Sequence, residues 1–213
     1  MKQFENLIEP DSLHWQKLLG LLSQQGLTED PVLMKSLQKL ALGSNYAINQ
    51  LCKYPALIIH LKHYQHFELE ADKLIKVLEE SSDIVQIKQQ LRVFRHQKLL
   101  EIIYLDVCLH ETIENTLLQL SQLADLLIQQ ALKKTEQILS AKHGQPVDTL
   151  GKDMSLNIIA MGKLGGRELN FSSDIDLICC YSDDGQLDGY GKLSHSQFFT
   201  LVVKLLKQFL HET

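Results

Sequence analysis

The spacing of apolar residues is the feature that most constrains the fold of this chain. Between residues 113 and 131, apolar side chains recur at steps of four, three, four, three and four, which places them along one side of a helix. They are Ile113, Leu117, Leu120, Ala124, Leu127 and Ala131. This stripe predicts a long helix whose apolar side packs in a bundle core, and no helix from another chain is required.

Start and stop signals extend the helical prediction over most of residues 11–140. Asp11 or Ser12 can cap a first helix, and a second is expected to begin near Asp30-Pro31 because proline is tolerated in the first turn. Ser44 and Asp83 are expected to open two further helices. Gly26 and Pro55 are the expected stops. The helix after Asp83 is expected to carry Ile84, Ile87, Leu91, Phe94 and Lys98 along one side. We therefore predict a helical domain over residues 1–140.

The pattern changes after residue 140. Residues 141–154 contain glycine, proline and charged side chains without apolar periodicity, which predicts a linker. Leu156–Met161 and Ile175–Tyr181 are short apolar runs typical of strands, and residues 194–210 have the period of a helix. The prediction is a predominantly helical α+β chain in which residues 155–213 begin a second domain with a small mixed sheet.

Composition excludes several classes of function. The 21 basic and 26 acidic side chains give a net charge of -5, whereas nucleic-acid binders need a surplus of Lys and Arg. No apolar run approaches the roughly 20 residues that cross a bilayer, and the first ten residues lack the apolar core of a signal peptide. The four cysteines, Cys52, Cys108, Cys179 and Cys180, are expected to be reduced and buried in a cytoplasmic protein.

Two carboxylates stand one residue apart in the second predicted strand. Alternate side chains of a strand share a face, so Asp174 and Asp176 are expected to point one way while Ile175 and Leu177 point into the core. Two adjacent carboxylates favour a cation between them, and Mg²⁺ prefers one or two carboxylates together with phosphate oxygens and water. A solvated strand end without a ligand is the alternative interpretation.

A glycine-rich turn precedes this pair. Gly162, Gly165 and Gly166 directly follow a predicted strand, and backbone amides in such a turn can converge on a phosphate. The amino end of a short helix over 164–169 and the positive charge of Lys163 would further favour binding of a phosphate. A tight turn without a ligand is the alternative. The spacing is neither that of a P-loop nor that of a dinucleotide-binding turn.

Residues 162–177, Gly-Lys-Leu-Gly-Gly-Arg-Glu-Leu-Asn-Phe-Ser-Ser-Asp-Ile-Asp-Leu, resemble the signature of the bifunctional glutamine synthetase adenylyltransferase/adenylyl-removing enzyme family. This family belongs to the DNA polymerase β-like nucleotidyltransferase superfamily. The segments 44–57 and 91–106 are similar to the family more weakly. The form Asn-Phe-Ser-Ser-Asp-Ile-Asp at 170–176 resembles the N-terminal, adenylyl-removing copy of two catalytic modules.

The resemblance implies a site and its ligands. Asp174 and Asp176 would be the catalytic residues and would hold Mg²⁺, and the nucleotide and phosphate would lie against Gly162, Lys163, Gly165, Gly166 and Ser173. Inorganic phosphate would attack an adenylyl-tyrosine of glutamine synthetase and release ADP. Glutamine synthetase, the PII signalling protein and the effector glutamine are the implied partners. The ATP-dependent adenylylating module and a noncatalytic docking fragment that binds glutamine synthetase or PII are the alternatives.

The resemblance also implies a third carboxylate on a later strand. Asp183, Asp184 and Asp188 follow the second predicted strand too closely to fill that position and are expected to be loop residues. We therefore expect the chain to be a fragment with an incomplete, inactive catalytic module. Elsewhere, His60, His63 and His66 recur at steps of three, and we interpret them as surface histidines rather than a zinc site, since no matching Cys or carboxylate accompanies them.

Overall fold

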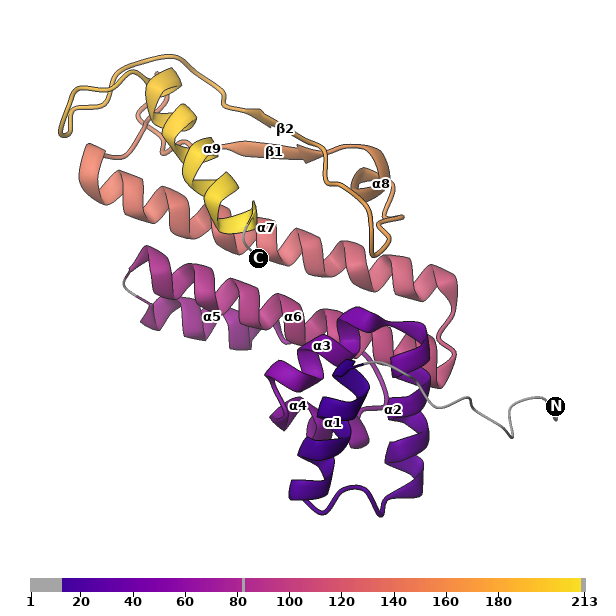
Figure 1. Cartoon of the computed structure of the whole chain (residues 1–213). Helices are drawn as coiled ribbons and strands as arrows, with labels where there is room; N and C mark the ends of the chain where they lie inside the picture. The colour runs from indigo at the N-terminus through magenta and orange to yellow at the C-terminus, as the bar shows by residue number, and fades with distance from the viewer. Residues whose placement is uncertain (1–12, 82, 212–213) are drawn as a thin grey trace. The chain divides into compact units, whose positions relative to one another are not determined.

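The computed structural model describes residues 13–81 and 83–211 (Figure 1). These residues form a predominantly helical α+β chain, as expected. The helices are α1 (Leu13–Gln24), α2 (Pro31–Gly43), α3 (Asn45–Lys53), α4 (Ala56–Lys62), α5 (Ala71–Glu80), α6 (Ile84–Leu109), α7 (Ile113–His143), α8 (Gly162–Gly165) and α9 (His195–His211). The strands are β1 (Asn157–Ala160) and β2 (Leu177–Cys180). None of the described helices has both the length and the apolarity to span a bilayer.

Local signals place the helix ends as predicted. The Asp30 carboxylate accepts the backbone N–H groups of Val32 and Leu33 at 3.1 Å each, which caps α2. Ser44 Oγ caps α3, and Gly26 follows α1 in the left-handed region with a φ of 67°. The expected cap at residue 11 or 12 lies outside the described residues.

The described residues group into two compact units. One contains the residues up to Glu68 together with His96–Thr116, and the other contains Leu69–Arg95 and the residues from Leu117 onward. The division crosses α6 between Arg95 and His96, and it places most of α7 with the two strands. The domain boundary expected at 141–154 rests on composition, and it stays a prediction.

The first unit is a small helical bundle. Its core contains Trp15, Leu18, Leu22, Leu33, Leu37, Leu40, Ile48, Leu51, Ile58 and Leu61, with Leu100, Ile103 and Tyr104 from the second half of α6. Within this unit the fully buried Glu101 carboxylate accepts hydrogen bonds from Tyr64 Oη at 2.8 Å and Lys98 Nζ at 2.9 Å. Buried charges are tolerated when they are paired in this way.

The second unit packs β1 and α9 against α7. Its core contains Met154, Leu156, Leu187, Phe198, Phe199 and Val202, with Leu132 and Leu139 of α7 against it. The predicted stripe on α7 is buried from Leu120 through Ala131, as expected. The first two positions of the stripe are not buried: Leu117 is half-buried, and Ile113 is 69% exposed because it is the first residue of the helix and lies before the packed stretch.

The sheet of the described residues has two antiparallel strands. Ile159 pairs with Ile178 and Ala160 with Leu177. Since β2 begins at Leu177, the predicted strand is too long at its start, and the two aspartates precede the strand instead of lying in it. The expectation that Ile175 points into the core is also wrong, since its side chain is 43% exposed.

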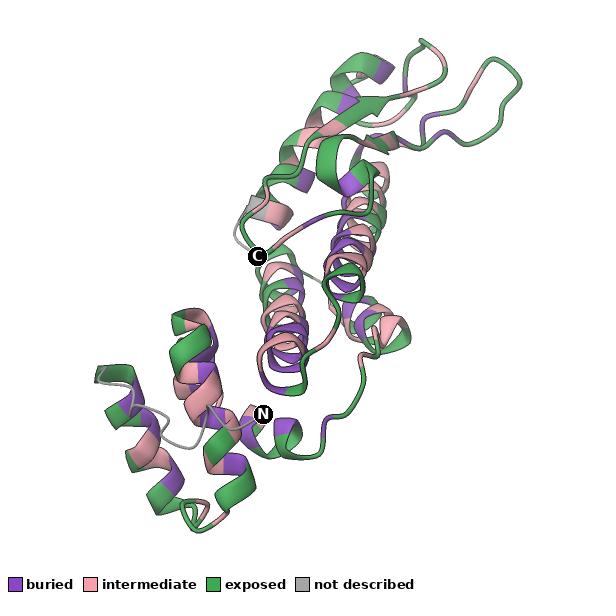
Figure 2. Ribbon diagram, turned by 90° about the vertical axis from the view of Figure 1, so that its right-hand side faces the viewer, coloured by how far each residue is buried: buried purple, intermediate pink, exposed green. Residues whose placement is uncertain are grey.

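One face of this sheet is open. Directly opposed residues of an antiparallel pair lie on the same face, so Ile159 and Ile178, which are 50% and 49% exposed, form a half-exposed apolar pair on one face of the sheet. Figure 2 shows both strands as largely exposed or half-buried. The cysteine prediction is wrong in part: all four thiols are unpaired, but Cys179 and Cys180 are exposed and Cys52 is half-buried.

Candidate functional site: the glycine turn and the aspartate pair

The glycine turn and the aspartate pair lie side by side where β1 ends and β2 begins. Met161 N donates to the carbonyl oxygen of Asp176 at 2.9 Å. This bond continues the strand pairing one step beyond Ala160 and Leu177. The residues that the sequence singles out in two separate motifs are therefore neighbours in space.

Gly162 is the closest link between the two motifs. Its φ of 54° lies in the left-handed region, which favours glycine. A Cβ atom at this position would stand 3.4 Å from Asp176 Oδ2. The turn therefore brings an exposed backbone segment directly against one of the two carboxylates.

The other two glycines shape the turn rather than offer free amides. Gly165 N donates to Met161 O at 3.1 Å, and Gly166 N donates to Gly162 O at 3.0 Å. A Cβ atom on Gly165 would lie only 2.5 Å from Ala160 O, so this position needs glycine for close backbone packing. The helix α8 spans Gly162–Gly165 instead of the predicted 164–169, so it is shorter and begins two residues earlier, at the first glycine of the turn.

The two carboxylates are available for a ligand. Asp174 and Asp176 are both exposed, and the described part of the chain provides neither of them with a side-chain hydrogen bond or ion pair. Lys163, on the first turn of α8, is exposed as well. These groups are free to meet a ligand from solvent.

Ser173 is held by a turn that the sequence analysis did not assign. Its hydroxyl donates to Asn170 Oδ1 at 2.7 Å and accepts the N–H of Asn170 at 3.1 Å. Asn170 Oδ1 also accepts the N–H of Ser172 at 3.1 Å. Asn side chains commonly stabilise turns in this way, so the Asn-Phe-Ser-Ser run was a signal for a rigid turn directly before Asp174.

Ser121 on α7 is a second residue that the motifs did not indicate. Its hydroxyl accepts the N–H of Leu169 at 3.2 Å across 48 residues of sequence. No local pattern in the sequence identifies such a contact, because it depends on how α7 packs in the second unit.

The donor set fits Mg²⁺. Carboxylate oxygens are hard ligands, and Mg²⁺ is commonly bound through one or two carboxylates with water and substrate phosphates completing its shell. The described residues contain no group of three or more His, Cys, Asp or Glu side chains placed for a metal. The pair Asp174 and Asp176 is therefore suited to a metal that arrives with phosphate oxygens rather than to a closed structural site.

The later acidic residues are loop residues, as expected. Asp183 accepts the N–H of Thr149 at 3.0 Å, and this bond lowers the pKa of its carboxyl group. Asp184 accepts the hydroxyl of Tyr181 at 3.0 Å. His195 Nδ1 donates to the carbonyl of Asp183 at 3.0 Å. These contacts hold the loop against Thr149, Tyr181 and the start of α9, and none of them involves the aspartate pair.

The three spaced histidines are exposed, as predicted, and do not share a ligand set. His60 Nε2 lies 2.8 Å from Glu101 Oε1, and His66 Nε2 lies 2.8 Å from Glu68 Oε1. His63 follows the end of α4.

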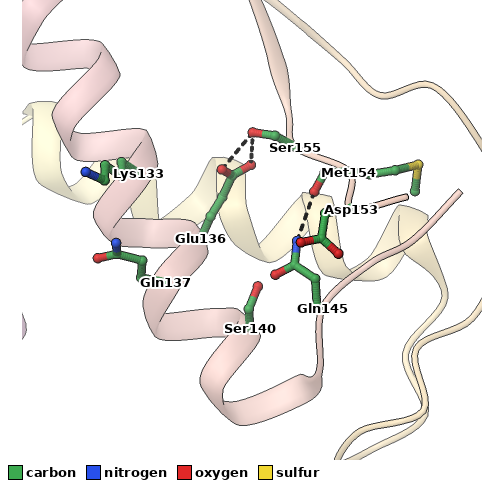
Figure 3. A pocket seen from close by; sticks show the side chains of 8 residues that line it. All are labelled: Lys133, Glu136, Gln137, Ser140, Gln145, Asp153, Met154 and Ser155. Carbon is green, nitrogen blue, oxygen red and sulfur yellow. Dashed lines mark hydrogen bonds between the residues drawn. The ribbon is translucent and has the colours of Figure 1, made fainter. Parts of the chain in front are cut away.

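A shallow pocket lies elsewhere on the second unit, between α7 and the segment that leads into β1 (Figure 3). Its lining residues are Lys133, Glu136, Gln137, Ser140, Gln145, Asp153, Met154 and Ser155. Glu136 accepts the hydroxyl of Ser155 at 2.7 Å and the N–H of Leu156 at 2.7 Å. This pocket contains none of the predicted site residues, and Glu136 is engaged in holding the strand.

A glycine turn against an aspartate pair, on a helical α+β chain, is the arrangement that the sequence resemblance implies for a nucleotidyltransferase. Comparison with known proteins gives the family within this class. The family model described as glutamate-ammonia ligase adenylyltransferase matches residues 34–213, so the chain belongs to this family.

Relatives of known name agree with this assignment. The bifunctional glutamine synthetase adenylyltransferase/adenylyl-removing enzyme of Shewanella loihica is 33% identical over 205 residues, which cover 93% of this chain and 21% of that protein. The protein of the same name from Mannheimia haemolytica is 40% identical over 142 residues, covering 66% of this chain and 15% of that protein. The chain thus spans about a fifth or less of the length of these relatives.

Proposed function

We propose that this chain is part of the adenylyl-removing module of a glutamine synthetase adenylyltransferase. The observation that carries the proposal is the contact between the turn and the pair: Gly162 lies where even a Cβ atom would stand 3.4 Å from Asp176 Oδ2. A phosphate held against this turn would be adjacent to a carboxylate-bound cation. That adjacency is what transfer of a nucleotidyl group requires.

In the proposed reaction, an oxygen of inorganic phosphate attacks the phosphorus of AMP bound to a tyrosine of glutamine synthetase. A new P–O bond forms, the bond between phosphorus and the tyrosine oxygen breaks, and that oxygen takes up the proton that the attacking hydrogen phosphate loses. ADP and the free tyrosine are released. When bound, Mg²⁺ would neutralise charge on the phosphate oxygens. Asp174 and Asp176 hold the cation, Gly162 admits the phosphate close to the backbone, and Lys163 attracts its negative charge.

We further propose that the site is incomplete within residues 1–213. Two strands alone make a marginal sheet, and the apolar pair Ile159 and Ile178 is half exposed. Both features are explained if further strands or helices of a longer polypeptide cover this face and provide a third carboxylate. Action in the cytoplasm, binding of PII and control by glutamine would then be properties of the longer protein.

Calorimetric titration with ADP and Mg²⁺ tests the site. The chain is expected to bind ADP only when Mg²⁺ is present, and Asp174→Asn and Asp176→Asn are each expected to abolish detectable binding. Asp188→Asn is the matched control, because Asp188 is an exposed acid in the later loop. Equal binding by all three variants and the unaltered chain would rule out the proposed site.

An activity assay tests the reaction and its direction. The 213-residue chain is expected to release no ADP from adenylylated glutamine synthetase in the presence of phosphate, whereas the same chain extended to the length of its relatives releases it. ATP-dependent adenylylation by the extended protein, abolished by the Asp174→Asn change, would instead assign the site to the adenylylating module.

A further inference from the structure

One face of α7 lies against the loop that leads from the glycine turn to the aspartate pair. Ser121 and Asp125 are four residues apart on this helix, a spacing that places their side chains on the same face. The facing loop residues are Arg167 and Leu169. Figure 1 shows the loop after α8 lying beside α7, and the hydrogen bond from Leu169 N to Ser121 Oγ joins the two.

The hydroxyl of Ser121 is committed to two bonds. It donates to the carbonyl of Leu117 at 2.8 Å within α7 and accepts the N–H of Leu169 at 3.2 Å. Ser121 is only 1% exposed and Leu169 only 7% exposed. Water therefore cannot easily replace the hydroxyl as the partner of this amide, and loss of the hydroxyl leaves a buried N–H group without an acceptor.

The loop itself needs such an anchor. Arg167 adopts a φ of 58°, a left-handed conformation that is strained for a residue with a side chain and persists only where the surroundings enforce it. Asp125 adds an electrostatic contact: burial raises the pKa of its carboxyl group, and the positive charge of Arg167 opposes that rise. The hydrogen bond from Leu169 to Ser121 and the electrostatic contact between Arg167 and Asp125 both act on residues 167–169 of the loop.

The anchored loop continues directly into the site. Leu169 precedes Asn170, whose side chain organises the turn to Ser173, and Asp174 follows. The geometry points to Ser121 as a positioning residue: its hydrogen bond to Leu169 fixes the loop that leads to Asp174 and so keeps Asp176 against the glycine turn. The role of the two carboxylates in this inference rests on the proposed function. The anchoring of the loop by Ser121 does not depend on that function.

The test compares two hydroxyl deletions on the same helix. Ser121→Ala removes the bond to the loop. Thr135→Val is the matched control, because the Thr135 hydroxyl is fully buried and also donates to the carbonyl four residues earlier, at 2.8 Å. Should Ser121→Ala fail to fold, Ser121→Cys keeps the volume of the side chain and weakens the acceptor.

Two readouts separate anchoring from a general loss of stability. Hydrogen exchange is expected to increase at the amides of residues 167–170 in Ser121→Ala and to stay unchanged there in Thr135→Val. Affinity for Mn²⁺ in the presence of ADP, measured by electron paramagnetic resonance, is expected to fall about 10-fold in Ser121→Ala, the size of effect known for residues that orient metal ligands. Thr135→Val is expected to keep the affinity of the unaltered chain.

The outcomes are distinct. Unchanged exchange at residues 167–170 in both Ser121 variants would overturn the anchoring, and increased exchange with unchanged Mn²⁺ affinity would overturn the positioning role. If the unaltered chain binds no Mn²⁺ with ADP, the proposed function fails and the positioning role with it, whereas exchange still decides whether Ser121 anchors the loop.

Discussion

At the scale of single residues, the two adjacent glycines of the turn have different tasks. Gly165 lies so close to the carbonyl oxygen of Ala160 that a Cβ atom would be 2.5 Å from it, whereas the nearest atom to a Cβ on Gly166 is 3.6 Å away. Gly166 also has a φ of -79°, which any residue adopts easily. Substitution of these two glycines therefore separates the effect of a steric clash, expected at Gly165, from the effect of simply replacing a glycine, expected at Gly166.

Gly165→Ala is expected to destabilise the chain by about 1–3 kcal/mol, the usual cost of forcing an extra carbon into a packed site. Gly166→Ala is expected to change the free energy of unfolding by less than about 0.5 kcal/mol. Urea unfolding of both variants measures the difference. Equal effects would show that the backbone of β1 can move away from the turn.

At the scale of elements, α7 holds the start of β1 through one carboxylate. Glu136 accepts the N–H of Leu156 and the hydroxyl of Ser155, each at 2.7 Å. Leu156 is buried, and β1 begins at the next residue. This contact fixes the position of the strand whose other end carries the glycine turn.

Glu136→Ala is expected to lower the free energy of unfolding by about 1.5–3 kcal/mol, the contribution of a hydrogen bond to a charged group. Gln137→Ala, at the neighbouring exposed position of α7, is the control and is expected to have almost no effect. Denaturant unfolding followed by circular dichroism checks the pair. A loss of similar size in both variants would contradict the assigned role of Glu136.

The start of α2 gives a prediction with a pH dependence. The hydrogen bond from Lys62 and the backbone N–H groups of Leu33 and Val32 lower the pKa of Asp30 below its ordinary value of 3.8. A lowered pKa means that the ionised carboxylate stabilises the folded chain above pH 3.8 and that this contribution disappears as the pH falls through the lowered value.

Asp30→Asn keeps the capping oxygen and removes the charge. The variant is expected to be less stable than the unaltered chain at pH 7, and the difference is expected to shrink as the pH is lowered below 3.8. Thermal unfolding temperatures measured from pH 7 downward check this. A difference that stays constant over the whole range would show that the charge of Asp30 does not contribute.

The elements also show what the sequence can and cannot predict. The starts of α2 and α3 were predictable because Asp30 and Ser44 act on amides two or three residues away. The exposure of Ile175 was not predictable, because β2 begins only at Leu177. The exposure of Cys180 was not predictable either, because Cys180 lies on the half-exposed face of Ile159 and Ile178. The role of Ser121 was not predictable for a different reason: its partner Leu169 is 48 residues distant in the sequence.

At the scale of the whole molecule, the chain matches about a fifth or less of the length of its relatives, and one face of its sheet is open. A polypeptide that continues over this face would bury Ile159 and Ile178. The same side chains would then contribute little to stability in the short chain and much more in the long one. Substitution on this face therefore reports whether the sheet is completed.

Ile178→Thr is expected to change the free energy of unfolding of the 213-residue chain by less than about 0.5 kcal/mol, as for exposed positions. In the chain extended to the length of its relatives, the same change is expected to cost about 1–3 kcal/mol because a buried apolar group is replaced by a polar one. Denaturant unfolding of the 213-residue chain and of the extended chain, each with and without the Ile178→Thr change, measures this difference. A small effect in the extended chain would show that the face stays open.

We propose that Asp174 and Asp176 hold a divalent cation beside the glycine turn, and every other part of the proposed function depends on this site. Nuclear magnetic resonance with paramagnetic Mn²⁺ tests it most directly, since Mn²⁺ broadens the signals of nearby amides. We expect broadening centred on residues 161–166 and 173–177, which excess Mg²⁺ reverses and which is absent when both aspartates are changed to Asn. Broadening centred on the loop of Asp183, Asp184 and Asp188, or unchanged broadening in the double variant, would contradict it.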